Sequence, residues 1–135
     1  MNKESPDIGA LLARALLSAV FLYSGIGKLL GPEAAMAYIA KAGMPWPAMA
    51  YAAALCVEVV VATAFLLGYK TRISAFVLLA FTLATALLFH ADFGDKSQLI
   101  SFLKNLAICG GLLQVLISSP GALRSRQGAV MRPAG

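Results

Sequence analysis

The chain has 135 residues, of which 60% are hydrophobic and 13% charged, and its mean hydropathy is +0.81. Ordinary soluble domains are about 45–50% apolar and about 25% charged, and small domains bury the smallest share of their surface. The composition therefore excludes a soluble globular enzyme, a disordered chain and a nucleic-acid-binding module. We expect one membrane domain whose solvent and main partner is the lipid bilayer.

Four stretches of the chain are long and apolar enough to cross a bilayer, which takes about 20 residues per helix. Backbone groups in lipid must be paired within a helix or a closed barrel, and these stretches are rich in Leu and Ala without period-two alternation. The sequence therefore predicts an all-α integral membrane four-helix bundle over residues 8–119. The expected spans are Ile8–Leu30, Ala48–Gly68, Arg72–His90 and Leu99–Ser119.

A shorter helix is expected between the first two spans. Gly31 ends the first span, and Pro32 suits the first position of a new helix. Gly43 and the segment Pro45–Pro47 forbid its continuation. The resulting segment, Pro32–Ala42, is too short to cross the bilayer, and its aromatic and lysine side chains suit a helix lying at the membrane interface.

Lysine and arginine are divided unevenly between the two sides that this topology defines. Because cytoplasmic loops carry an excess of positive residues, we predict that both termini are cytoplasmic, with tails at 1–7 and 120–135. The predicted cytoplasmic side carries Lys3, Arg14, Lys70, Arg72, Arg124, Arg126 and Arg132. The other side carries Lys28, Lys41, Lys96 and Lys104, together with Glu33, Asp92 and Asp95.

Ionisable residues inside the expected spans are the candidates for chemistry, because such side chains usually face a bundle interior, a cavity or a partner. Glu58 lies near the middle of the second span, so it is either protonated or paired with a cation. The nearest cations by depth are Lys28 and Lys104, and we predict that one of them pairs with Glu58. Arg14 either joins such a site or extends its charge to the interface, where a lipid phosphate is the alternative contact.

Helical spacing groups polar and small residues on one face of the first span, which should pack against the other helices. Ser24 lies one turn from Lys28 on this helix. Tyr51 lies seven residues before Glu58, on the same face of the second span. The residues of the polar face in the first span are Arg14, Ser18, Gly25 and Lys28.

Polar residues from all four spans are expected at a similar depth. Lys28, His90, Lys104 and Asn105 fall in the outer half of the bilayer, with Glu58 at mid-depth. This convergence predicts a polar pocket that opens outward. His90 is ambiguous: extrapolated as helix it lies about 140° around the axis from Thr85, so it is either a helix-end residue or a group that exchanges protons near neutral pH.

The two cysteines, Cys56 and Cys109, are too few and too far apart for a disulfide framework or a metal site. They can be bridged only if their Cα atoms lie within about 7 Å. Free thiols that behave as small apolar side chains are therefore expected. No metal site is predicted.

Five short motifs lie along the chain, with Glu58 at mid-span between the second and third: Leu12–Leu17, Phe21–Leu29, Leu67–Arg72, Leu88–His90 and Phe102–Leu106. Taken together, they resemble the DoxX family over residues 11–120. The resemblance implies a four-helix protein of the bacterial inner membrane, with relatives linked to quinone-dependent sulfur oxidation or to membrane redox complexes. The sequence has no CxxC, paired haem histidines or glycine-rich nucleotide loop, so no covalently bound cofactor is expected.

The leading hypothesis is a redox-associated membrane subunit that binds a quinone or a similar small amphipathic molecule in the outward pocket. Glu58 would manage a proton, Lys28 and Lys104 would stabilise negative charge on an oxygen, and His90 would relay protons. Any catalysis would be that of a membrane oxidoreductase subunit. The expected ligand-binding residues are Ser24, Tyr51, Asn105 and Arg14.

Two other function classes stay open. One is a small proton-coupled transporter, in which Glu58 would be the coupling site of a homo-oligomer. The other is an accessory or scaffold protein of a membrane complex with redox protein partners, in which the polar cluster only specifies helix packing.

Overall fold

The structure is a computed structural model that describes residues 8–119, and its regular elements over that range are all helices. Four helices of 19 to 23 residues in the described range are long and apolar enough to span a membrane, so the predicted all-α membrane bundle is confirmed. The tails 1–7 and 120–135 lie outside the described residues, and their cytoplasmic location stays a prediction. The elements are α1 (Ile8–Leu30), α2 (Pro32–Lys41), α3 (Pro47–Leu55), η1 (Cys56–Val61), α4 (Ala62–Leu67), α5 (Thr71–Phe89) and α6 (Lys96–Ser118).

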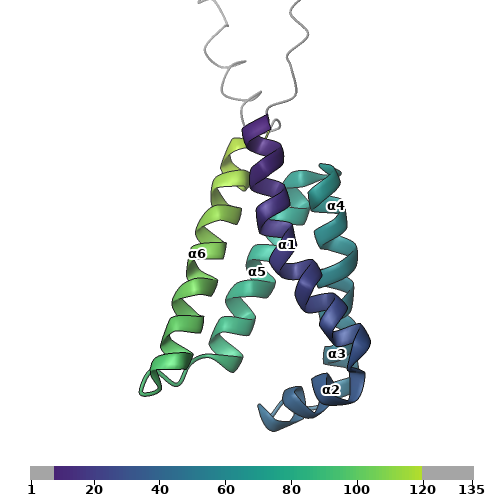
Figure 1. Cartoon of the computed structure of the whole chain (residues 1–135), viewed down its shortest axis with the longest axis vertical. Coiled ribbons are helices and arrows are strands. Elements are labelled where there is room, and N and C mark those ends of the chain that lie inside the picture. The colour runs from purple at the N-terminus through teal and green to yellow at the C-terminus, as the bar shows by residue number, and fades with distance from the viewer. Residues whose placement is uncertain (1–7, 120–135) are drawn as a thin grey trace, which may run out of the picture.

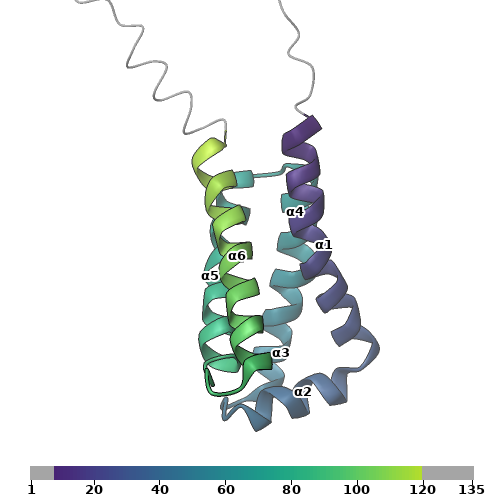
Figure 2. The same cartoon turned by 60° about the vertical axis from the view of Figure 1, so that its left-hand side comes forward.

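The second span is built from three consecutive elements: α3, the π-helical turn η1, and α4. Helices α5 and α6 lie side by side as an antiparallel pair (Figures 1 and 2). The start of α1, the turn between α4 and α5, and the end of α6 lie together at what we call the terminal end. Helix α2 and the loop between α5 and α6 lie at the opposite, α2 end.

Local residue chemistry explains most helix boundaries. Pro32 and Pro47 occupy the first turns of α2 and α3, where a missing N–H is harmless. Gly68 adopts a left-handed φ of 77° that ends α4. Helix α6 begins at Lys96, three residues earlier than predicted, because the Asp95 side chain accepts a hydrogen bond from Ser97 N at 2.9 Å and caps the helix. The predicted short helix is present as α2, and its location at the interface stays a prediction.

The helices are tightly packed toward the terminal end, where one hydrophobic cluster joins all four spans. Large apolar side chains on their outer faces are exposed, as expected where lipid replaces water. Toward the α2 end, α1 diverges from α5 and α6 (Figure 2). This divergence leaves room inside the bundle for the site described next. The buried cluster consists of Phe21, Ala62, Phe65, Ala75, Leu78 and Leu112.

Candidate functional site

The face of α1 that was expected to pack against other helices does so along the second span. Ser18 is buried, and its Oγ donates to the Ala62 carbonyl at 3.4 Å. About two and three turns further along, Gly25 and Lys28 contact η1. The polar face of α1 therefore contacts the second span at several levels along the helix and fixes how the two spans pack.

Gly25 allows the closest approach between α1 and the π-helical turn. A Cβ added at Gly25 would lie 2.7 Å from Val59 Cγ2 and 3.2 Å from Glu58 Cβ. The first distance is shorter than atoms can tolerate, so only glycine fits without movement. The glycine thus brings the Glu58 backbone against α1 and places its side chain beside Ser24 and Lys28.

The π-helical turn η1 was not predicted from the sequence. The Ala62 N–H donates to the Val57 carbonyl, five residues earlier, as in a π-helix. The Thr63 hydroxyl donates to the Val59 carbonyl at 2.6 Å, which satisfies another backbone acceptor of this turn. The valines on both sides of Glu58 are β-branched and weaken the ordinary α-helix. Such single π turns occur frequently at functional sites.

Glu58, Lys28 and Ser24 form a buried polar network. The Lys28 ammonium donates to Ser24 Oγ at 2.9 Å and to Glu58 Oε1 at 3.1 Å. Ser24 Oγ in turn donates to Glu58 Oε1 at 3.0 Å. The predicted partner of Glu58 is therefore Lys28.

The two oxygens of Glu58 differ in their partners. Oε1 accepts two hydrogen bonds, whereas Oε2 lies 2.9 Å from Lys28 Nζ as an ion pair. Oε2 is buried and accepts no hydrogen bond from the described residues, because the approach of Nζ falls outside hydrogen-bond geometry. A carboxylate oxygen has room for more than one donor. Oε2 thus retains an acceptor position that no described residue fills.

Tyr51 supports this network from α3. Its hydroxyl donates to the Lys28 backbone carbonyl at 2.9 Å. That carbonyl is near the end of α1, where backbone acceptors lack partners in the helix. Tyr51 therefore fixes the end of α1 and the position of Lys28, and we assign it a positioning role.

The network faces a cavity of about 760 Å³ inside the diverging half of the bundle. This volume lies within the range of small-molecule sites, about 300–1,000 Å³. Glu58, Lys28 and Ser24 form one polar wall, and Thr85, His90 and Asn105 form part of the opposite wall. Most other lining residues are apolar: they are Val20, Phe21, Gly27, Gly31, Ala34, Ala35, Tyr38, Ile39, Met44, Ala50, Ala53, Ala54, Phe81, Thr82, Ala84, Leu88, Phe89 and Ile108.

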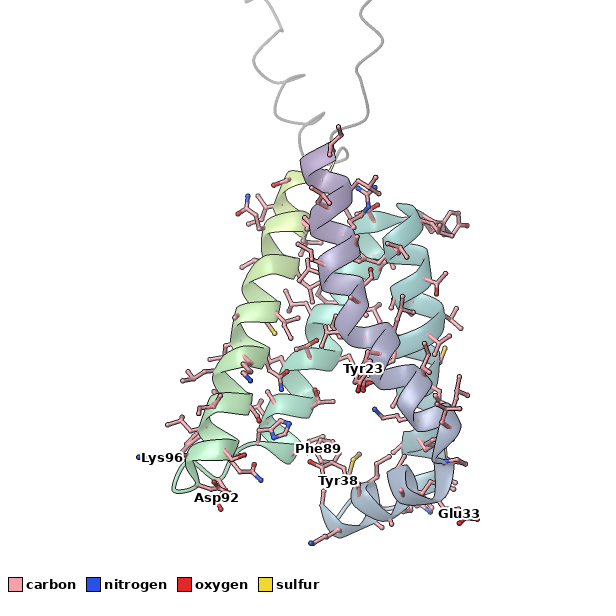
Figure 3. The ribbon with its side chains drawn as sticks, in the orientation of Figure 1. Tyr23, Glu33, Tyr38, Phe89, Asp92 and Lys96 are labelled. Carbon is pink, nitrogen blue, oxygen red and sulfur yellow. The ribbon has the colours of Figure 1, made fainter. Side chains whose placement is uncertain are left out.

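Helix α2 lies across the α2 end of this cavity. Tyr38 of α2 and Phe89 of α5 point toward one another, as Figure 3 shows. Their rings are stacked, with centroids 5.3 Å apart and planes at 18°. Both residues line the cavity, so the stacked pair joins α2 to α5 along its edge.

His90 is placed differently from its helical extrapolation. Helix α5 ends at Phe89, and His90 has φ −130° and ψ 31°, which is not helical. The changed backbone direction brings His90 to the same cavity that Thr85 lines. Its imidazole has no hydrogen-bond partner within the described part of the chain.

Three of the proposed site residues, Tyr51, Lys104 and Arg14, do not line the cavity. Asn105 faces the cavity from α6, and its neighbour Lys104, about 100° around the helix, is exposed on the outer face. Arg14 lies at the terminal end, where its guanidinium packs against Gly68. Neither Lys104 nor Arg14 can therefore contact a ligand held beside Glu58.

The cysteines do not contribute to the network. Cys56 and Cys109 are free thiols, and Cys56 is exposed on the outer face of the bundle. The Cys109 thiol lies 3.8 Å from the Leu79 carbonyl. Among residues 8–119, no group of three or more His, Cys, Asp or Glu side chains is placed to hold a metal ion.

Four membrane-spanning helices around a buried polar network define a multi-pass membrane protein with an internal site. The chain belongs to the DoxX family, whose model matches residues 9–91. It is 36% identical over 120 residues to the inner membrane protein YqjF of Escherichia coli (strain K12), covering 89% of this chain and 91% of that relative. It is 34% identical over 118 residues to inner membrane protein YphA of the same organism, covering 84% of each. The chain is thus a multi-pass inner membrane protein; no solved structure gives a significant match.

Proposed function

We propose that the cavity beside Glu58 binds a quinone, or a small amphipathic molecule of similar size and polarity, and that the protein is a redox-associated membrane subunit. The observation that carries this proposal is an ion pair that is shielded from the surface of the bundle and lines a largely apolar cavity. Glu58 is only 5% exposed, yet it lines a space of about 760 Å³ and has an oxygen that accepts no hydrogen bond from the described residues.

The location of the ion pair argues against a purely structural role. A buried ion pair contributes little net stability compared with packed apolar side chains. A pair that only joined helices would be best enclosed by close packing, which the other half of the bundle achieves. The cavity instead leaves one side of the pair open to a ligand.

The lining residues fit a ring with polar oxygens and an apolar tail. The Lys28 ammonium, which has three N–H groups, can donate to a carbonyl oxygen, and the Glu58 carboxylate can accept from a hydroxyl. Asn105 and His90 offer further polar groups on the opposite wall. Alanine, leucine and phenylalanine side chains between these walls suit the apolar part.

Each polar group has a role that follows from its position. A bound quinone supplies redox chemistry in which proton transfer accompanies electron transfer. The Glu58 carboxylate holds or accepts a proton, and the Lys28 ammonium stabilises negative charge on a nearby ligand oxygen. His90, on the opposite wall near the α2 end of the cavity, relays protons to or from the ligand in this proposal. The electrons come from a redox protein partner in this proposal.

The direct test is extraction of the protein purified in mild detergent, followed by mass spectrometry of the extract. We expect a quinone at close to one molecule per chain from the unaltered protein. Glu58→Gln keeps the side-chain shape but removes the charge, and it should lower the quinone content severalfold. A matched change on the outer face, Lys104→Met, should leave it unaltered. Equal quinone content in the Glu58→Gln and unaltered proteins, or only bulk phospholipid in both, would refute the assignment.

A further inference from the structure

Within the part of the chain that the structure describes, the terminal end of the bundle carries positive charge without neighbouring acidic groups. Among residues 8–119, Arg14, Lys70 and Arg72 lie at this end. The four acidic residues of the described range lie away from this end. The ion pair found within residues 8–119 joins Lys28 and Glu58. The remaining lysines balance these acids, four charges against four: Lys28, Lys41, Lys96 and Lys104 against Glu33, Glu58, Asp92 and Asp95.

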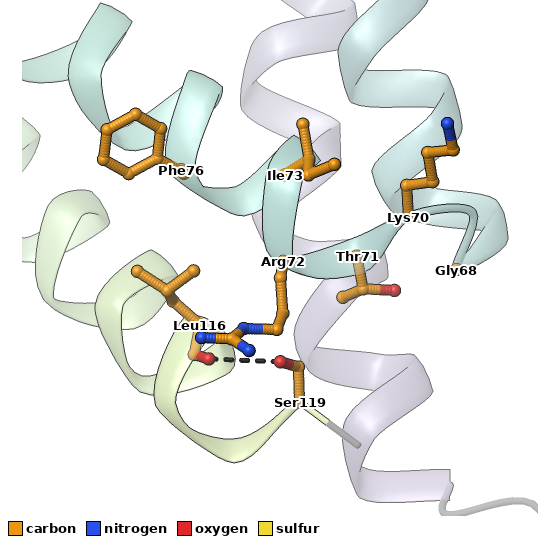
Figure 4. A pocket seen from close by; sticks show the side chains of 8 residues that line it. All are labelled: Gly68, Lys70, Thr71, Arg72, Ile73, Phe76, Leu116 and Ser119. Atoms are coloured by element: carbon orange, nitrogen blue, oxygen red, sulfur yellow. Dashed lines mark hydrogen bonds between the residues drawn. The ribbon is translucent and has the colours of Figure 1, made fainter. Parts of the chain in front are cut away.

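A groove of about 820 Å³ lies between the start of α5 and the end of α6 at this charged end. Lys70, Thr71 and Arg72 line it around the start of α5, and Ser119, which directly follows α6, lines it from the other helix. In Figure 4, Arg72 extends toward the end of α6. Arg72 is also exposed, so its guanidinium is open to a ligand at the membrane surface.

The groove becomes apolar away from the charged residues. Ile73 and Phe76 follow Arg72 along α5, and Leu116 lines the groove from α6 (Figure 4). Ile73 and Phe76 are more than half exposed, at 62% and 59%. Since α5 spans the membrane, these residues lie at the depth of the acyl chains next to the charged surface. One continuous groove therefore combines cations at the surface with apolar walls below them.

Arg14 adds a third cation beside the groove. Its guanidinium covers Gly68, a lining residue: a Cβ added there would lie 3.5 Å from Arg14 Nη2. Arg14 Nε is buried and has no hydrogen-bond acceptor among the described residues. The Lys70 ammonium lies 5.6 Å from the centre of the Tyr69 ring, a contact that leaves its charge unneutralised.

We propose that this groove binds one anionic phospholipid, with its phosphate and headgroup at Arg72 and Lys70 and an acyl chain along Ile73, Phe76 and Leu116. Arginine pairs with phosphate oxygens through parallel hydrogen bonds, and basic pockets between membrane helices bind anionic headgroups. The apolar walls select a lipid over a free phosphate, which would leave them without a partner. This lipid site lies at the opposite end of the bundle from the Glu58 cavity and does not depend on the function proposed for it.

The test is native mass spectrometry of the full chain in mild detergent, titrated with phosphatidylglycerol or with phosphatidylethanolamine of the same acyl chains. We expect one tightly bound phosphatidylglycerol and at least about tenfold weaker binding of the zwitterionic lipid, the factor that about 1.4 kcal/mol gives. The double variant Lys70→Gln, Arg72→Gln should lose about tenfold in affinity by the same conversion. The control Lys41→Gln, Lys96→Gln removes equal charge elsewhere and should bind as the unaltered chain does.

Folding and the source of the phosphate are checked in the same experiment. Size-exclusion chromatography and helical circular dichroism should show that both double variants are folded, and Arg72→Lys should retain an intermediate affinity. Equal loss in the two double variants would indicate general charge attraction and overturn the site. Equal binding of both lipids would do the same. Displacement of the lipid by an equimolar amount of glycerol phosphate would assign the site to a free phosphate and overturn the lipid assignment.

Discussion

Lys28 on α1 and Glu58 on the π-helical turn form an ion pair, with Nζ 2.9 Å from Oε2, inside a bundle whose spans are otherwise mostly apolar. Two residues distant in sequence support the pair through folding. Tyr51, 23 residues from Lys28, donates to the Lys28 carbonyl, and Ser24, 34 residues from Glu58, donates to Glu58 Oε1. Burying a charge at this depth carries a strong desolvation penalty, which the attraction between the two charges offsets only while both are present. The contact therefore determines how α1 docks on the second span.

The first prediction concerns the coupling between these two residues. Lys28→Met leaves Glu58 buried without its cation and should cost about 3–5 kcal/mol of folding free energy. Lys28→Met combined with Glu58→Leu removes both charges and should cost less than the sum of the single changes, with a coupling of about 0.5–3 kcal/mol. Thermal or denaturant unfolding in detergent measures these differences.

Lys104→Met is the control for this cycle, because Lys104 is exposed on α6. Its effect on stability should stay within about 0.5 kcal/mol. Strict additivity of the Lys28 and Glu58 changes would show that the two side chains do not interact in the folded protein.

The second prediction concerns the close approach at Gly25. Gly25→Ala forces a Cβ to within 2.7 Å of Val59 Cγ2 and should destabilise the protein by about 1–3 kcal/mol through overpacking. Adding Val59→Ala removes the clashing methyl group and should restore part of the loss. Gly110→Ala is a suitable comparison, because a Cβ there meets nothing within 4 Å. No rescue by Val59→Ala would mean that Val59 does not limit the approach of α1.

The third prediction concerns the turn between α4 and α5. Gly68 has φ 77°, a left-handed conformation that costs other residues about 1–2 kcal/mol. Gly68→Ala should therefore lower stability by about that amount although the space for a Cβ is adequate. Gly68→Asn should cost less, because asparagine tolerates this conformation. Unfolding experiments that rank Asn below Ala would contradict the backbone explanation.

The fourth prediction concerns α2 as the edge of the cavity. Tyr38→Ala removes the ring stacked on Phe89 and should cost about 0.5–1.5 kcal/mol of local stability. Hydrogen–deuterium exchange should then increase in α2 more than in the core of α5. Phe93, in the loop before α6, makes a different aromatic contact, with Phe102 of α6. Phe93→Ala removes that contact and should leave exchange in α2 unchanged. Equal exchange in α2 with and without Tyr38 would exclude the stack as its attachment.

The spans could be predicted from the sequence because bilayer thickness fixes the length of an apolar helix. The pairing of Glu58 with a lysine followed from its depth, since a carboxylate at mid-span needs a partner. The choice between Lys28 and Lys104 did not follow, because it depends on the rotation of α6 about its axis. The side chains of α6 are apolar on most of its faces, so its sequence pattern does not determine that rotation. In the structure, Leu112 is the fully buried residue of this helix.

Two further features depend on tertiary structure. The π-helical turn forms where Gly25 lets α1 press against Val59, a contact between residues 34 positions apart that no local pattern encodes. His90 reaches the cavity because α5 ends one residue earlier than expected and the chain changes direction there. Helix ends of this kind are the least predictable positions in a sequence.

The most direct measurement of the central claim is calorimetric titration of the detergent-solubilised protein with a benzoquinone that carries a short alkyl tail. The unaltered chain should bind one molecule saturably. Lys28→Met should weaken binding by about tenfold or more, since hydrogen bonds to charged groups contribute about 1.5–3 kcal/mol, whereas Lys104→Met should leave the Kd within about twofold. Unchanged affinity in Lys28→Met, or equal weakening by both lysine variants, would contradict the assignment of the Glu58 cavity as the binding site.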